Sequence, residues 1–514
     1  MLTSRPRRSH GTEAKTPIGK AIARSSLAAR VVVLASLFVI MVLFGVLVGK
    51  VRHATLDDRI EFVPGEHLQS RPFWEPGVEF HDDALAAELR GILEQFQARQ
   101  QALQEADASD DDHVVVEEEH VEGNEHKLPR AFVVSSDMHM YTNDDMPYFD
   151  ESVADFRTRA RHLLAVGRKR TMFVSIGSFR DDLCPATLAE LFAKAEHPEN
   201  VYVGLVDQVK LDGDSDDVAC DSTIDDRFRK QIRLVRLHSM EGAGPTHARY
   251  IASKLWQGEE FYFQIDSHSH FLQNWDTVLM DMIDRLPDPS RSIITHYPPG
   301  DEAEFNDPNP PWNCVTRRLR DAPAGLFIQE SDWCFEENRT PGIAVGDDGK
   351  PTTCVSPFMG AGMIVGRSQW IVDVPFDKYL PYLFHGEELL LASRLWTSGW
   401  DMFTPSRNII DHKYGGREKN VFAETSEWAM VSEQSAARAR YILKNPLPGD
   451  DDMEFDPSEI AELGLGSSRS YEAYLEFGAI DLKDGNSTGR CGQWYDWQTK
   501  EWKGKAKVLP ISNE

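Results

Sequence analysis

Positive charge is scarce in this sequence. The 514 residues include 55 Lys and Arg against 83 Asp and Glu, a formal net charge of -28. Because nucleic-acid backbones attract an excess of Lys and Arg, this balance argues against a nucleic acid as a partner. With 41% hydrophobic and 10% aromatic residues, the chain is not a disordered protein. It can bury a large core, as one big domain or two fused ones with appendages.

Cysteine is also rare, and no CxxC pair occurs. An even number of cysteines without that pattern favours disulfides over a zinc site. The nearest-neighbour pairings are Cys184 with Cys220 and one pair within Cys314, Cys334 and Cys354. Free buried cysteines are the alternative, and the connectivity stays open. Two sequons, at residues 338–340 and 486–488, are glycosylation acceptors in a secretory compartment or coincidences.

The apolar run at residues 31–49 contains neither charge nor proline and lies between Arg30 and Lys50. At 1.5 Å rise per residue it is just long enough to span a bilayer. A cleaved signal peptide is the alternative, but the run is longer than a usual signal core and no small-x-small site follows it. Basic residues predominate before it, which places residues 1–30 in the cytosol. The sequence thus predicts a single-pass type II membrane protein with its remainder luminal or outside.

Residues 50–165 have the composition of a stem. Apolar residues recur at spacings of three, four and seven between residues 82 and 106, which indicates an amphipathic helix or short coiled coil able to dimerise the stem. The acidic stretch at residues 105–125 has little to bury and is expected to be a solvated spacer.

From about Arg168, short β-branched and aromatic runs alternate with helical segments, which is typical of a parallel, nucleotide-binding α/β sheet. Strands are expected at 171–177 and 201–206, with a helix at 186–195 between them. Ligands of such sheets bind beyond the carboxyl ends of the strands, so Ser175, Arg180 and Asp207 are predicted to contact a nucleotide. The alternative is that Arg180 and Asp207 are surface charges beside turns.

A further strand at 232–237 leads through a glycine-rich turn into a helix that carries Arg249 in its first turn. From there the guanidinium could contact a phosphate with two hydrogen bonds. An ordinary solvated arginine is the alternative.

The run at 261–265 predicts a buried strand that ends in Asp266 and His268. Alternate residues of a strand point to the same face, so both side chains can reach one divalent ion. A carboxylate oxygen with an imidazole nitrogen suits Mn²⁺ or a similar borderline ion better than Ca²⁺. A turn-forming Asp is the alternative.

Glu387 and Glu388 begin a segment whose apolar residues at 389–396 predict a helix packed inward. One of the two carboxylates, with a slight preference for Glu387, is expected to face the site, where it could hold sugar hydroxyls or orient an acceptor. A charge that stabilises the helix N-terminus is the alternative.

Several motifs follow one another in order from about Met172 to His412: residues 173–181, 244–250, 264–268, 384–388 and 394–401. With these the chain resembles the polypeptide α-N-acetylglucosaminyltransferases, which act on hydroxyproline or start mucin-type glycans. The resemblance implies a GT-A fold, a Rossmann-like mixed sheet flanked by helices, with UDP-GlcNAc as donor, a divalent metal, and retention of the anomeric configuration. Asp266 and His268 match the family's Asp-x-His metal position. The resemblance also suggests a late histidine, His412, as third ligand, with His270 and Asp411 in reserve.

The predicted organisation is a cytosolic tail (1–30), a transmembrane helix (31–49), a stem (50–165), a glycosyltransferase domain (166–445) and a C-terminal extension (446–514). The aromatic residues of the extension pack on the core or stack on a glycan, and no lectin repeat is visible. The predicted function is transfer of GlcNAc from UDP-GlcNAc to Ser, Thr or hydroxyproline of secretory proteins by a metal-dependent Golgi enzyme. The alternatives are a catalytically silent sugar-binding or scaffold protein, and a transferase that uses UDP-GalNAc or UDP-galactose.

Overall fold

A computed structural model describes residues 139–140, 151–210, 215–300, 305, 307–318, 326–343, 346, 348–415, 419–424, 428–447, 454–482, 489–507 and 509. All of these lie in one compact unit, Gly123–Glu514. The predicted cytosolic tail, transmembrane segment, amphipathic stem helix and acidic spacer fall outside the described residues. Within the described ranges, no helix has the length and apolar character needed to cross a bilayer.

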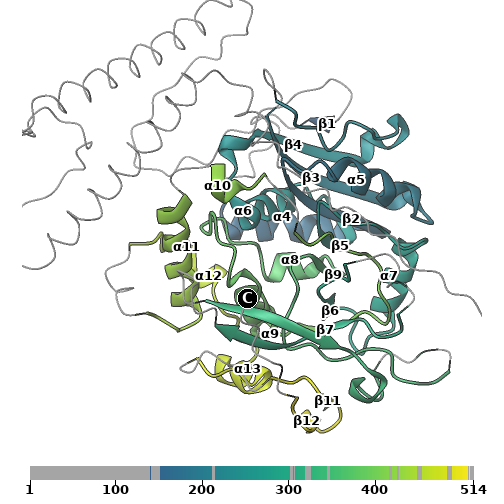
Figure 1. The fold of residues 1–514 in the computed structure, drawn as a ribbon, viewed down its shortest axis with the longest axis vertical. Coiled ribbons are helices and arrows are strands. Elements are labelled where there is room, and N and C mark those ends of the chain that lie inside the picture. Colours follow the sequence, from purple (N-terminus) through teal and green to yellow (C-terminus); the bar gives the residue numbers. More distant parts are fainter. Residues whose placement is uncertain are drawn as a thin grey trace, which may run out of the picture. The chain divides into compact units, whose positions relative to one another are not determined.

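The unit is built on an eight-stranded mixed sheet with the order β1-β4-β3-β2-β5-β9-β6-β10 (Figure 1). The strand β9 is antiparallel to both of its neighbours, β5 and β6, and the other pairs are parallel. The expected mixed α/β sheet is therefore confirmed. The strands are β1 (His139–Met140), β2 (Arg168–Phe179), β3 (Val201–Val209), β4 (Ile232–His238), β5 (Glu259–Asp266), β6 (Ser292–Thr295), β9 (Met363–Arg367) and β10 (Asp401–Phe403).

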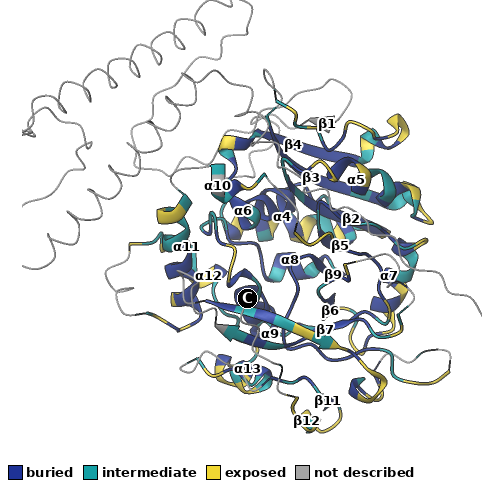
Figure 2. Ribbon diagram, viewed as in Figure 1, coloured by how far each residue is buried: buried dark blue, intermediate teal, exposed yellow. Residues whose placement is uncertain are grey.

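Helices cover both faces of this sheet, because successive strand residues point to opposite sides. On one face Phe173 and Tyr262 share a core with residues of α4, α6, α8 and α9. On the other face Met172 and Phe263 pack with α5 and α7. The central strands are consequently buried on both sides (Figure 2). These helices are α4 (Val153–Val166), α5 (Cys184–Ala193), α6 (Gly244–Lys254), α7 (Trp275–Asp284), α8 (Gln369–Asp373) and α9 (Glu387–Thr397).

The C-terminal extension packs against the sheet domain. Trp497 lies against Phe403 of β10, and Trp502 lies against Trp312 of β7, with ring centroids 5.8 and 6.4 Å apart. The remaining elements are β7 (Pro311–Arg318), β8 (Phe327–Trp333), α10 (Val421–Glu424), α11 (Trp428–Ile442), α12 (Ile460–Leu463), α13 (Tyr471–Gly478), β11 (Gln493–Asp496) and β12 (Glu501–Gly504).

All six cysteines are paired. Cys184 bonds to Cys220, as the nearest-neighbour pairing predicts, and the pair within the second group is Cys334–Cys354. Cys314 bonds instead to Cys491, which ties the extension to β7. Free buried cysteines are thereby excluded.

One of the two sequons is closed by the fold. Asn338 is buried and its side-chain amide donates to the carbonyl of Gln493, while Thr340 is fully buried. A folded chain therefore does not present Asn338 to a glycosylating enzyme. The other sequon, at residues 486–488, lies outside the described residues.

Loop length predicts that the two disulfides of the same buried cluster contribute unequally to stability. Cys314–Cys491 closes a separation of 177 residues and Cys334–Cys354 one of 20. Chain entropy then gives roughly 5 and roughly 3 kcal/mol respectively. We expect the Cys314→Ser/Cys491→Ser variant to unfold at a lower urea concentration than Cys334→Ser/Cys354→Ser. Since all four sulfurs are buried together, equal midpoints would show that loop length does not decide the difference.

Candidate metal centre and donor site

Two segments far apart in the sequence meet where β5 ends. Asp266 is the last residue of β5, and the chain after it runs beside the segment that follows β10. Leu272 donates its backbone N–H to Ile409, and Lys413 donates to the carbonyl of His268, at 2.8 and 3.1 Å. This pairing places His412 beside His268, 144 residues away in sequence.

The side chains of Asp266, His268 and His412 converge, with one ligand atom from each within 4.8 Å of the others. The Nε2 atoms of the two histidines are 3.0 Å apart, and the Nε2 of His412 is 2.9 Å from the Oδ2 of Asp266. Ligands at right angles around an octahedral ion, bound at about 2.1 Å, lie about 3.0 Å apart. The donor set and its spacing therefore fit a divalent ion of the Mn²⁺ type.

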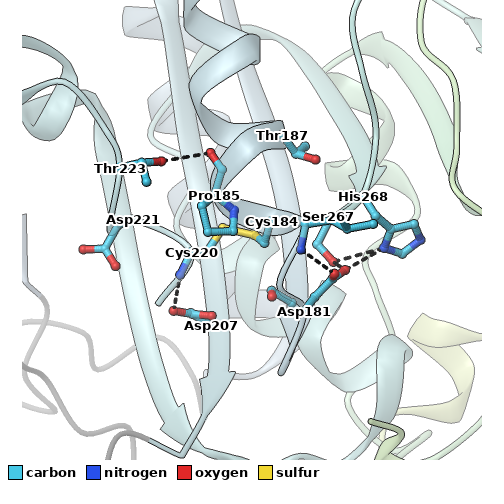
Figure 3. Close-up of a disulfide and its surroundings, with 12 residues drawn as sticks. Asp181, Cys184, Pro185, Thr187, Asp207, Cys220, Asp221, Thr223, Ser267 and His268 are labelled. Atoms are coloured by element: carbon cyan, nitrogen blue, oxygen red, sulfur yellow. Dashed lines mark hydrogen bonds and ion pairs between the residues drawn. A yellow bond between two sulfur atoms is a disulfide. The ribbon is translucent and has the colours of Figure 1, made fainter. Parts of the chain in front are cut away.

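Asp181 orients His268 from behind (Figure 3). Its Oδ2 lies 2.7 Å from the Nδ1 of His268 and accepts a hydrogen bond from the hydroxyl of Ser267 at 2.7 Å. A proton held on Nδ1 by this carboxylate leaves the lone pair of Nε2 directed at the cluster. Burial raises the pKa of Asp181, but the hydrogen bonds from His268 and Ser267 outweigh it and hold the pKa below its usual value.

The sequence interpretation did not single out Asp181. Its only local signal is its position just beyond the carboxyl end of β2, directly after Arg180. The Cys184–Cys220 disulfide lies next to this loop, and Cys184 is the first residue of α5 (Figure 3).

Arg249 links the cluster to Glu387. Its guanidinium donates to the Oδ1 of Asp266 at 2.9 Å and to the Oε2 of Glu387. Burial raises the pKa of Asp266, but the hydrogen bond to His412 and the charge of Arg249 hold it below its usual range. Burial raises the pKa of Glu387 and prevails over the opposing effect of Arg249. The structure thus brings together five of the predicted site residues.

Glu388 has different partners from its neighbour. It accepts hydrogen bonds from the hydroxyl of Tyr297 and from the backbone N–H of Ala361, the latter at 2.9 Å. Burial raises its pKa to about 7. Both glutamates follow Gly386, whose positive φ of 90° opens the turn into α9. Tyr297 is a second residue that the sequence interpretation did not single out.

The other predicted nucleotide contacts have partners of their own. Ser175 lies in the middle of β2, paired with Gly204 and Gln264, and is buried in the sheet. Arg180 is not an exposed surface charge, because its side chain is only 12% exposed and donates to Asp217 at 2.7 Å and Glu424 at 2.6 Å.

Asp207 is also fully buried. It accepts the backbone N–H of Cys220 at 3.1 Å and pairs with Arg236. Burial raises its pKa to about 6. The reserve metal ligands His270 and Asp411 form a pair with each other at 3.0 Å.

A family model described as "Glycosyltransferase (GlcNAc)" matches residues 171–226 and 219–484, together more than half of the chain. No curated protein sequence matches this chain.

Among solved structures, the chain is similar to GalNAc-T7 with UDP, GalNAc and Mn²⁺, at 13% identity and a TM-score of 0.37, covering 60% of this chain and 56% of that one. It is also similar to S. aureus TarS 1–349 with UDP-GlcNAc, at 13% identity and a TM-score of 0.33, covering 55% and 69%. A third is the mannosyltransferase PcManGT from Pyrobaculum calidifontis with GDP-Man and Mn²⁺, at 14% identity and a TM-score of 0.29, covering 65% and 80%.

Replacing Asp181 by Asn is expected to weaken Mn²⁺ binding about 10- to 100-fold, because the amide no longer fixes the tautomer of His268. Titration calorimetry with Mn²⁺ measures the change. Asp276→Asn is the matched control, since Asp276 is also a buried carboxylate but accepts from the backbone of Glu196 and His197. Equal Mn²⁺ affinity in the Asp181→Asn variant and the wild type would contradict the orienting role.

The raised pKa of Glu388 predicts a pH-dependent stability. The folded state holds this proton up to about pH 7, whereas an ordinary Glu loses it near 4.5. Between these values the folded state binds more protons than the unfolded state, so the free energy of unfolding falls as the pH rises. Glu388→Gln should remove this pH-dependent loss. On going from pH 4.5 to pH 8, the free energy of unfolding of the variant should therefore rise by roughly 1–3 kcal/mol relative to that of the wild type. Urea unfolding at both pH values tests this, and the exposed Glu462→Gln should show no such gain.

Proposed function

Because the chain belongs to the glycosyltransferase (GlcNAc) family, we propose that it transfers GlcNAc from UDP-GlcNAc to a hydroxyl group of a protein. In this proposal Asp266, His268 and His412 hold a divalent cation, Mn²⁺ foremost. The observation that carries the proposal is the convergence of these three side chains at the carboxyl end of β5. Ligands of α/β sheets bind at this edge.

Gly362 gives the cluster space on one side. A Cβ at this position would lie 3.2 Å from the Oδ2 of Asp266 and 3.5 Å from the ring of His412. Because glycine has no side chain, the face of the cluster next to it stays open to a phosphate group. When bound, a divalent cation would offset the negative charge that develops on the diphosphate leaving group.

Arg249 is assigned a positioning role. Both of its hydrogen-bonding arms are directed at carboxylates, one in the cluster and one at the start of α9. It therefore holds Asp266 and Glu387 at a fixed separation, and it adds positive charge to the edge where a diphosphate would lie. Arg180 and Asp207 lie at the neighbouring strand ends, where a nucleotide would extend, and Ser175 stays a weaker candidate because the sheet encloses it.

Glu387 is assigned to the hydroxyls of the donor sugar. A carboxylate accepts hydrogen bonds from vicinal hydroxyl groups, and Glu387 is anchored by Arg249 for this purpose. Glu388, hydrogen-bonded to Tyr297, is assigned to orienting the acceptor. We assign no protein nucleophile to either glutamate, because the retaining transfer that the family resemblance implies need not use one.

The acceptor is proposed to be Ser, Thr or hydroxyproline of a secretory-pathway protein, reached from the Golgi lumen by a type II membrane enzyme with a dimeric stem. The three disulfides support an oxidising compartment, because such bonds are rare in the cytosol.

The full-length chain should release UDP from UDP-GlcNAc in the presence of Mn²⁺, faster with Ser/Thr-rich or hydroxyproline peptides, and a chelator should abolish the release. UDP-GalNAc and UDP-glucose, offered separately, should be poor donors. Asp266→Asn and His412→Ala should each lower the rate on the order of 100-fold or more. Each variant changes a ligand of the divalent cation that stabilises the UDP leaving group.

His270→Ala is the matched control, because His270 is a neighbouring histidine that pairs with Asp411 outside the cluster. It should keep the rate within about twofold of wild type, the size of an ordinary surface change. UDP release that resists the chelator, or an equal loss in His270→Ala and His412→Ala, would contradict the metal assignment. No release from any donor would favour the silent scaffold.

A further inference from the structure

A cavity of about 390 Å³ opens at the end of β5 opposite to the metal cluster. It lies between the last turn of α4, the first residues of β2 and the turn that joins α6 to β5. Its volume falls in the range of small-molecule sites, about 300–1,000 Å³. The walls combine apolar side chains, among them Leu163, Val166 and Trp256, with the cations Arg159, Arg168 and Lys254.

The apolar part of the wall reaches the surface. Val166, at the end of α4, is 73% exposed, whereas Leu255 and Trp256, which also line the cavity, are buried. A single exposed valine needs no explanation, but here it continues an apolar wall that leads into the cavity. A ligand with an apolar body could cover this surface.

Two of the cations that line the cavity share one carboxylate. Glu151 pairs with Arg159 at 2.6 Å and with Lys254 at 3.3 Å. Lys254 is buried, and that burial, aided by the charge of Arg159 and opposed by Glu151, lowers its pKa to about 8. The ammonium group therefore lies where additional negative charge would stabilise it.

The second carboxylate is shared in the same way. Glu259 pairs with Arg233 at 2.5 Å and with Arg168 at 3.6 Å. Among the described residues that line the cavity, three are cations and none is acidic. The C-termini of α4 and α6 both point to this region and each contributes about half a negative charge. Together with Glu151 and Glu259, these helix ends offset part of the cationic charge, which suits a monoanion better than a dianion.

We propose that this cavity binds a singly charged amphiphilic anion, whose charged group lies at Arg168 and Lys254 and whose apolar body lies against Leu163 and Val166. The ligand chemistry is that of a sulfonate, carboxylate or phosphodiester carried on a hydrocarbon. This site shares no residue with the metal cluster and is independent of the proposed transferase function.

Titration calorimetry on the full chain with three probes tests the proposal. Hexane-1-sulfonate carries both features of the ligand, 1-hexanol lacks the charge, and inorganic sulfate lacks the apolar body. We expect heat of binding from the sulfonate alone. Binding of hexanol with the same affinity, or no binding of the sulfonate, would overturn the proposal.

Two variants locate the bound sulfonate. Val166→Asp places a like charge on the apolar wall and Arg168→Gln removes an exposed cation, and each should weaken binding at least about tenfold, the equivalent of 1.4 kcal/mol. Met430→Asp is the matched control, because Met430 is a comparably exposed residue of α11, at 66%. Equal weakening in Val166→Asp and Met430→Asp would overturn the assignment to this cavity.

Vesicles distinguish the two sources of such an anion. If a lipid headgroup supplies it, more of the wild-type chain should sediment with phosphatidylglycerol vesicles than with phosphatidylcholine vesicles, and Val166→Asp should remove this excess while Met430→Asp retains it. If a soluble molecule supplies it, Val166→Asp should lose sulfonate binding with no change in sedimentation.

Discussion

The candidate site depends on the backbone pairing between the segment after β5 and the segment after β10. Asp266 and His268 come from one continuous stretch, so their proximity is local, but a third ligand must arrive from elsewhere. The hydrogen bonds from Leu272 to Ile409 and from Lys413 to His268 supply it, because they fix His412 opposite His268. Without this pairing the strand end would present only Asp266 and His268 of the three converging side chains.

Charge balance then determines how the surrounding groups are arranged. Asp266 pairs with both His412 and Arg249, and Arg249 in turn pairs with Glu387 at the start of α9. Because a buried charge without a partner costs several kcal/mol, each of these groups constrains the next. Asp181 extends the same arrangement behind His268, in a loop that leads directly to the disulfide-bonded Cys184 (Figure 3). One network thus couples side chains from the loop after β2, from α6, from the end of β5, from α9 and from the segment after β10.

How much of this could be predicted follows from how local each signal is. The apolar runs that became β2, β3, β4 and β5 and the Asp-x-His pair are contiguous in sequence, so strand periodicity predicted them. Pairing within the sheet is not local, and the antiparallel insertion of β9 between β5 and β6 left no sequence signal. Cys491 likewise pairs with a residue 177 positions away. His412 was predicted as the third ligand only through the family resemblance, because the residues around it in the sequence show no pattern typical of a metal ligand.

Asp181, Asp207 and Glu388 show why a strand-end position alone does not assign a role. All three are acidic and lie at the same edge of the sheet or at the helix that faces it, yet their partners differ. Asp181 meets a histidine and a hydroxyl and keeps a low pKa, whereas burial dominates for Asp207 and Glu388 and raises their pKa values to about 6 and about 7. The sequence predicts the residue type and its place at the carboxyl edge of the sheet. The partner that decides the protonation state is supplied by the fold.

The two ends of β5 illustrate the same point with opposite charges. At its carboxyl end Asp266 and two histidines converge on a position suited to a cation, and at its amino end Glu151 and Glu259 are each shared between two cations. The helices that flank the strand offset part of this polarity, because α4 and α6 end near its start and helix C-termini carry partial negative charge. A strand of eight residues therefore separates the proposed cation site from the proposed anion site. Sequence composition, at a net charge of -28, predicts neither, since each depends on which few side chains the fold brings together.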